Sequence, residues 1–121
     1  MCLAHRLFLA LCCMSAVCLA SGARSEDDTT PNGRKRLLSE ITDLIHTAHR
    51  CDLGTSELRA MAEHVLRLAS ADPDYRKLAN RHLVELSASL NGPRRYNSAG
   101  CSRVRLQVEA DTETMKVRLR L

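Results

Sequence analysis

Aromatic side chains are scarce in this 121-residue chain, which has two Tyr, one Phe and no Trp. Phe8 lies in an N-terminal apolar stretch, so Tyr75 and Tyr96 are the aromatic residues of the rest of the chain. The core must therefore consist of Leu, Val, Ile and Ala side chains, each of which contributes about 1.5–3 kcal/mol on burial. Such a core gives a short chain a thin margin of stability, which association with a partner would widen.

Motifs of enzymatic chemistry are missing as well. No serine lies in a Gly-x-Ser-x-Gly context, and the sequence has neither a phosphate-binding loop nor an EF-hand. His46 and His49 are three residues apart and could share a zinc ion, but no third ligand is marked by its spacing. We therefore expect no enzyme activity, no catalytic residue, no bound metal and no cofactor.

The charge pattern argues against nucleic-acid binding. A net charge of +4, spread along the chain, does not indicate a nucleic-acid-binding protein. Asn-x-Ser/Thr acceptors for glycosylation are absent. A set of basic residues in the last third of the chain predicts either a surface for glycosaminoglycans or an acidic receptor, or charge that only aids solubility. These residues are Arg94, Arg95, Arg103, Lys116, Arg118 and Arg120.

The N-terminus has the pattern of a secretory signal peptide, predicted over residues 1–23. His5 and Arg6 precede an apolar run from Leu7 to Ala20, and small residues follow it. At about fourteen residues the run is short for a membrane span, which needs about twenty. We therefore expect secretion through the endoplasmic reticulum, removal of the signal and no membrane span in the mature chain.

Few cysteines remain in the chain after removal of the predicted signal peptide. Of the six cysteines, four lie within residues 1–23, which leaves Cys51 and Cys101. In an oxidising compartment the simplest interpretation is one disulfide between them. It would close a loop of about fifty residues and stabilise the fold by about 4 kcal/mol. The alternative is that one or both cysteines pair with another chain.

Three amphipathic helices are predicted in the middle of the chain, after a flexible polar segment over residues 24–36. They span about Leu37–Arg50, Ser56–Ala69 and Pro73–Leu90, the last with Asp72 as N-cap. Apolar residues at helical spacing mark each buried stripe; in the third helix these are Tyr75, Leu78, Ala79, Leu83, Leu86 and Leu90. His82, outside this stripe, is expected at the helix surface or boundary.

The C-terminal part alternates between apolar and polar residues, which is the pattern of β-strands. The two stretches are Val104–Glu109 and Met115–Leu121, with Asp111–Thr114 as a hairpin turn between them. The predicted fold class is mainly α, with three short helices followed by a C-terminal β-hairpin or strand pair in a single domain over residues 37–121. Because a two-stranded hairpin leaves its edges unpaired, we expect an edge to pair with a neighbouring subunit.

A short run before the predicted strands carries a family resemblance. Arg94-Arg95 precedes Tyr96-Asn97-Ser98-Ala99-Gly100, and the chain ends with Val117-Arg118-Leu119 near its terminus. This arrangement resembles the small helical accessory subunit of the cytomegalovirus envelope pentamer. The resemblance implies a non-enzymatic subunit on the virion surface, which assembles with glycoproteins H and L and two further small subunits. It also implies a role in entry into epithelial, endothelial and myeloid cells and a host cell-surface receptor as a further partner.

The resemblance and the strand pattern together predict the partner-binding residues. They are Tyr96, Asn97, Ser98, Ala99, Gly100, Val104, Leu106, Val108, Val117, Leu119 and Leu121. Two alternatives stay open. The chain could be a secreted cytokine-like or hormone-like helical ligand, for which Arg34-Lys35-Arg36 would be a maturation site, or it could be a host-binding immune modulator.

Overall fold

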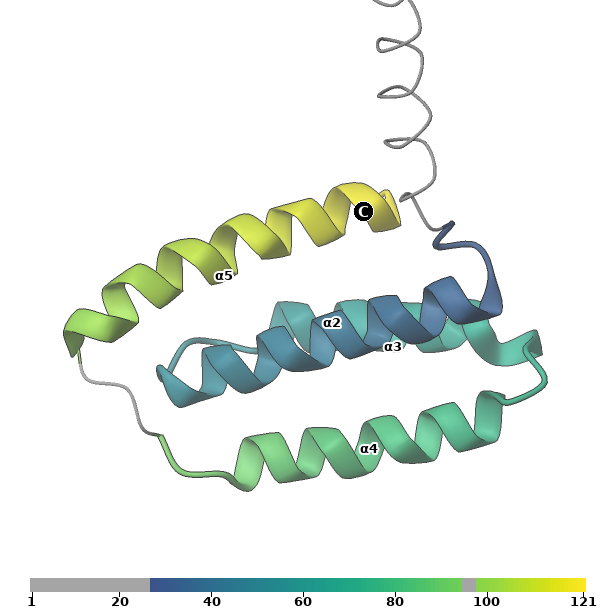
Figure 1. Cartoon of the computed structure of the whole chain (residues 1–121), viewed down its shortest axis with the longest axis horizontal. Helices are drawn as coiled ribbons and strands as arrows, with labels where there is room; N and C mark the ends of the chain where they lie inside the picture. The colour runs from purple at the N-terminus through teal and green to yellow at the C-terminus, as the bar shows by residue number, and fades with distance from the viewer. Residues whose placement is uncertain (1–26, 95–97) are drawn as a thin grey trace, which may run out of the picture.

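Four α-helices and a short 3-10 turn form the described part of the chain, in a computed structural model that describes residues 27–94 and 98–121. The helices are α2 (Pro31–Arg50), α3 (Ser56–Leu68), α4 (Tyr75–Asn91) and α5 (Ser98–Leu119), and the 3-10 turn η1 (Ala69–Ala71) follows α3. Helix α2 runs through the middle and contacts the other three (Figure 1). Helices α4 and α5 flank it on opposite sides in that view. The predicted signal peptide lies outside the described residues.

Helix α2 begins six residues earlier than the apolar stripe predicts. Thr30 is its N-cap and accepts a hydrogen bond from the backbone N–H of Gly33 at 3.0 Å, and Pro31 occupies the first turn. Residues 31–36, predicted to belong to a flexible segment, therefore form the first turns of this helix. A Cβ atom added to Gly33 would overlap the carbonyl oxygen of Asp27, so only glycine lets the preceding turn fold back this closely.

The core lies between α2 and α3, and none of the buried side chains among the described residues is aromatic. Its fully buried side chains include Leu37, Ile41 and Ile45 of α2 and Met61 and Val65 of α3. Helix α5 adds Val108 and Met115 at the edge of this cluster. The predicted aliphatic core is thus found, with two methionines among its members, and α2 supplies most of the surface on which the other helices pack.

Helix α4 buries a different face from the one predicted. Leu83, assigned to the buried stripe, is 61% exposed, whereas His82, assigned to the surface or boundary, is 4% exposed. The helix also begins at Tyr75 and not at Pro73. The carboxylate of Asp72, predicted as its N-cap, instead accepts two hydrogen bonds from the guanidinium of Arg34, at 2.8 and 2.5 Å. Because these bonds favour the ionised carboxylate, the pKa of Asp72 is lowered.

The predicted C-terminal β-hairpin is wrong: residues 98–119 form one continuous helix, and the described residues contain no strand. Thr112 and Thr114, expected in the turn, donate hydrogen bonds from their hydroxyls to the carbonyls of Val108 and Ala110, four residues earlier in the helix. Most of the intervening polar residues, such as Arg, Gln, Glu and Lys, favour helices over strands. A lone hairpin would also have lacked a third strand to stabilise it.

The alternating pattern has a different consequence on a helix than on a strand. On a strand, residues two apart share one face. On an α-helix they lie about 200° apart around the axis, so an alternating sequence distributes its apolar side chains over two opposite faces. Helix α5 is therefore not amphipathic in the usual sense, and only one of its two apolar faces can pack on α2.

A candidate interaction surface on helix α5

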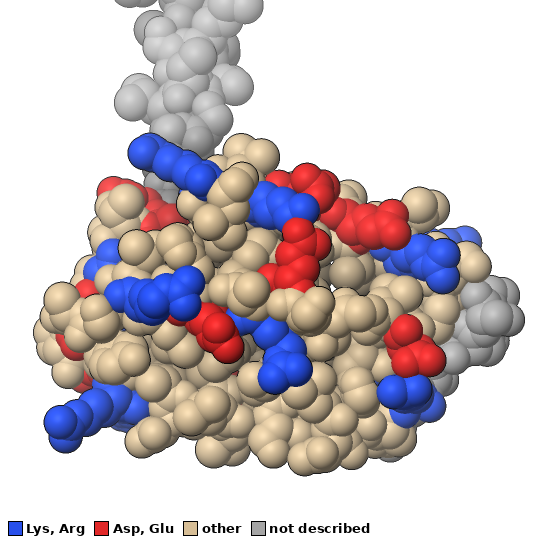
Figure 2. All heavy atoms as spheres, turned by 180° about the vertical axis from the view of Figure 1, so that it is seen from behind, with Lys and Arg blue, Asp and Glu red and all other residues tan. Residues whose placement is uncertain are grey.

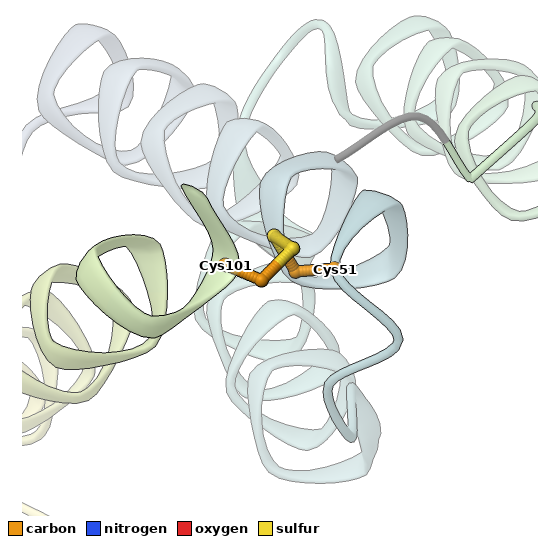
Figure 3. The surroundings of a disulfide bond; sticks show 2 residues. All are labelled: Cys51 and Cys101. Atoms are coloured by element: carbon orange, nitrogen blue, oxygen red, sulfur yellow. A yellow bond between two sulfur atoms is a disulfide. The ribbon is translucent and has the colours of Figure 1, made fainter. Parts of the chain in front are cut away.

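Helix α5 is joined covalently to the rest of the bundle at its first turn. A disulfide links Cys101 to Cys51, which is the residue that follows α2, with the two Cα atoms 5.4 Å apart (Figure 3). Cys51 is held in place by the end of α2, where the chain turns through Asp52 at a φ of 55°. The backbone N–H of Leu53 then bonds to the carbonyl of Ala48 at 2.9 Å, which completes a Schellman C-cap.

Ion pairs hold the other end of α5. The guanidinium of Arg118 bonds both carboxylate oxygens of Asp28, at 3.0 and 2.8 Å, and Glu40 of α2 at 2.5 Å. We call these three residues the Arg118 cluster. Two residues earlier, the Lys116 ammonium pairs with Glu57 of α3 and with Glu113 at 2.8 Å. The hydrogen bonds to carboxylates raise the pKa of both basic groups, so both stay charged.

Three of the six residues in the basic surface considered from the sequence are therefore paired with carboxylates, whereas Arg103 and Arg120 are exposed. Lys116 and Arg118 are engaged by four carboxylates, and Arg94 pairs with Asp52 at 2.8 Å. Arg95 lies outside the described residues. Figure 2, which shows the molecule from behind, has positive and negative side chains intermingled, with the widest uncharged area along its lower part. A large anionic polymer finds no continuous basic track on that face.

The inner face of α5 packs on the core. It consists of Val104, Val108, Met115 and Leu119, of which Val108 and Met115 are buried and the other two half-buried. The hydroxyl of Thr112 on the same face is also buried, and its hydrogen bond to the Val108 carbonyl satisfies its donor. These side chains pack mainly within the fold, and Val108 and Met115 have almost no surface left for another protein.

The outer face of α5 carries a second apolar stripe with no cover from the described chain. Leu106 is 69% exposed and Val117 is 77% exposed, and the exposed Ala110 lies between them at helical spacing. Leu121, just beyond the helix, continues the stripe and is exposed. Single exposed apolar residues are common on protein surfaces, but an aligned set on a helix anchored at both ends is typical of an interface.

The predicted partner-binding residues thus separate into three groups. Leu106, Val117 and Leu121 lie on the outer face, whereas Val104, Val108 and Leu119 lie on the inner face. Ser98, Ala99 and Gly100 form the first turn of α5, and Tyr96 and Asn97 lie outside the described residues. The strand pattern had placed all the apolar members on one face.

Sequence reasoning missed a second exposed apolar pair, on α4. Leu83 and Val84 are adjacent and both mostly exposed, on the helix that flanks α2 opposite α5 (Figure 1). The signal that could have found them is the alternative spacing Tyr75, Leu78, His82, Leu86 and Ser89, which turns Leu83 outward. This spacing is less apparent than the predicted stripe because it includes two polar residues, His82 and Ser89.

A cleft beside α5 is lined by acidic residues. It measures about 650 Å³ and lies between α5 and the segment that joins α2 to α3. Leu53, Leu58 and Val108 line it, and its carboxylates include Glu57 and Glu109. Glu57 is occupied by Lys116, so the cleft is partly neutralised from within.

The residues that could have held a metal are used otherwise. His49 Nε2 lies 3.1 Å from the carbonyl oxygen of Gly92, to which it can only donate, so it ties the end of α4 to α2. His46 is exposed on α2. Across residues 27–94 and 98–121, no three His, Cys, Asp or Glu side chains converge in a way that could bind a metal ion.

Within the same residues, no helix combines the length and apolarity that crossing a membrane requires. No protein-family model, curated protein or solved structure matches the chain.

Proposed function

We propose that this protein is a non-enzymatic, secreted subunit of a viral envelope glycoprotein entry complex, in which it helps to determine which cells the virus enters. The proposed partners are glycoproteins H and L and two further small subunits, as the resemblance of the Tyr96–Gly100 stretch implies. The observation that supports a subunit role most directly is the outer face of α5, an apolar stripe that the described chain leaves open to solvent.

The anchoring of α5 favours this role. The disulfide at one end and the Arg118 cluster at the other fix the helix on the bundle. The outer stripe is therefore presented on a rigid support, and a partner that binds it pays little for ordering the helix. The mode of association we propose is packing of a partner against the outer face of α5, which replaces the strand-edge pairing expected from the sequence.

The α4 surface extends the proposal. Leu83 and Val84 give the molecule a second exposed apolar site, on the far side of α2 from α5 (Figure 1). A subunit with two such sites can contact two neighbours at once, which suits a small protein within a complex of several chains.

The processed-ligand alternative is disfavoured by the position of the basic cluster. Arg34, Lys35 and Arg36 lie within α2, and Arg34 is bound by Asp72. Leu37, the residue that would become the new N-terminus, is buried in the core. A protease needs an extended, exposed segment, so cleavage here would require the first turns of the central helix to unwind.

Co-expression of the tagged chain with its candidate partners tests the proposal. The variant Leu106→Asp/Val117→Asp places two carboxylates on the outer face of α5 and should abolish recovery of glycoproteins H and L. Its circular dichroism and melting temperature should match those of the wild type, because neither side chain packs in the core. The control Ala60→Asp/Ser70→Asp adds the same charge at exposed positions of α3 and η1, outside both apolar surfaces, and should assemble normally. Normal recovery of the complex with the outer-face variant would refute the proposed interface.

A further inference from the structure

A cleft between the N-terminal half of α2 and helix α4 lies apart from the proposed α5 interface. Its volume is about 370 Å³, and no residue of α5 lines it. Small-molecule sites typically measure about 300–1,000 Å³, so the cleft is of a size that would accept one small ring with its substituents.

The rim of this cleft is basic. Lys35 of α2 faces Lys77 and Arg81 of α4, and the carboxylates of Asp74 and Glu85 lie among these cations. Lys35 pairs with Asp74 at 3.2 Å and Arg81 with Glu85 at 2.9 Å. Lys77 has no ion pair within the described residues and is exposed. The cleft therefore keeps a net positive rim and a lysine that is available to a ligand.

The base of the cleft contains a histidine whose protonation the hydrogen bonds define. The hydroxyl of Thr42 donates to the carbonyl of Leu38 at 2.8 Å, so toward His82 Nδ1, at 3.2 Å, it can only accept. Nδ1 must then carry the proton, which leaves the lone pair of Nε2 as an acceptor. His82 is 4% exposed and lines the cleft, and its Nε2 has no hydrogen-bond partner among the described residues.

Burial keeps this imidazole neutral. It lowers the pKa of His82, against a smaller opposing effect of the carboxylates of Glu85 and Glu63. Near neutral pH the cleft thus offers three features together. They are cations at the rim, a single hydrogen-bond acceptor near the base, and the apolar side chains of Leu38 and Leu78 on the walls.

We infer that this cleft binds an acidic saccharide unit. The carboxylate or sulfate of the sugar would pair with Lys77 and its basic neighbours, a ring hydroxyl would donate to His82 Nε2, and the C–H face of the ring would pack on Leu38 and Leu78. Inorganic phosphate matches the charge of the rim but offers nothing to the apolar walls. This site is independent of the α5 interface, so the outer-face variant of α5 keeps it.

Binding is measured by calorimetry on the full secreted chain with three probes: N-acetylneuraminic acid for a carboxylate, a sulfated disaccharide from heparin, and inorganic phosphate. At least one of the saccharides should bind, and phosphate should bind at least about tenfold more weakly. Binding of N-acetylneuraminic acid shows that a carboxylate is sufficient, whereas binding of the heparin disaccharide alone points to sulfate, because that disaccharide also carries a carboxylate. The nitrogen chemical shift of His82 Nε2 should move when a saccharide that binds is added, which a contact confined to the rim would not cause.

Matched variants on α4 test the position of the site. Lys77→Ala should weaken saccharide binding about tenfold, the value of one charge-assisted hydrogen bond. Arg76→Ala removes the same charge one residue away, outside the cleft, and should change binding by less than about twofold. Both residues are exposed, so neither change disturbs the fold. Absence of saccharide binding, equal binding of phosphate, or equal loss with both variants would overturn the inference.

Discussion

Helices α3 and α5 both pack on α2, yet different forces hold them there. Helix α3 has a single apolar stripe, from Leu58 to Val65, and its large side chains on that stripe are fully buried. Helix α5 divides its apolar residues between two faces and buries only Val108 and Met115 among them. It depends on a disulfide at one end and on ion pairs at the other. A helix fastened at its ends can therefore leave an apolar face free for another protein.

Removal of the disulfide between Cys51 and Cys101 should have the largest effect on stability. Cys51→Ser/Cys101→Ser opens a loop whose ends are 50 residues apart, and we expect the free energy of unfolding to fall by about 4 kcal/mol. Urea denaturation measures the loss. Hydrogen exchange should show that α5 loses protection before α2 and α3 do. If the three helices lost protection together, α5 would be as firmly packed as α3 and the comparison would fail.

The same substitution, Val→Ala, at three positions compares how tightly α3 and α5 are packed. Val65→Ala, in the α3 stripe, should cost about 2 kcal/mol because it leaves a cavity in the core. Val108→Ala, on the inner face of α5, should cost less, because the edge of the core can relax around it. Val117→Ala, on the outer face, should change stability by less than about 0.5 kcal/mol. Thermal denaturation of the three variants gives the order, and a large loss at Val117 would show that the outer face is covered.

Helix α4 adds a contact whose contribution to stability changes with pH near neutrality. The pKa of His82 in the folded chain lies below the usual 6.5, so the unfolded chain takes up the proton first as the pH falls. Stability should be constant above about pH 6.5 and should then decline toward the lowered pKa, with a slope of at most about 1.4 kcal/mol per pH unit for one proton.

Replacement of His82 by Gln should remove that decline, whereas His46→Gln, at an exposed position of α2, should leave it in place. Chemical denaturation at a series of pH values between 7 and about 5 measures the slopes. An unchanged slope in His82→Gln would assign the proton uptake to another group.

The C-cap of α5 should give the smallest effect, and a stabilising one. Arg120 has a φ of 57°, where a side chain is disfavoured, and the N–H of Leu121 bonds to the carbonyl of Lys116 at 3.0 Å. Arg120→Gly relieves the side chain and should raise stability by about 0.5 kcal/mol, after the greater freedom of glycine in the unfolded chain is subtracted. The control Arg105→Gly, inside the helix, should lower stability by about 1 kcal/mol.

The sequence predicted the fold correctly where the spacing of apolar residues is compatible with only one kind of secondary structure. The apolar stripes of α2 and α3 repeat at helical spacing, and the structure buries them as predicted. The interpretation of α5 failed because alternation of apolar and polar residues reads as a strand, although a helix with two apolar faces has the same sequence. Under the proposed function, a partner covers the second of these faces.

The polar contacts could not have been predicted. The bonds from Arg34 to Asp72 and from Arg118 to Asp28 join residues 38 and 90 positions apart, and no local pattern relates such residues. The cleft at His82 depends on the orientation of α4 about its own axis. This orientation differs from the predicted one, so that Leu83 is exposed and His82 is buried. Sequence spacing defines a helical face only to within about one residue in such cases.

The disulfide also divides the molecule mechanically. Helices α3 and α4 lie entirely between Cys51 and Cys101, so the cross-link shields them from a force that pulls on the two ends of the described chain. Such a force acts first on the contact between Asp28 and Arg118, which joins the segment before α2 to the last turn of α5. The force can then separate α2 from α5 only as far as the disulfide, which keeps the end of α2 joined to the start of α5. In a complex under tension, α3 and α4 would keep their shape, but the His82 cleft would open, because its other wall is the N-terminal half of α2.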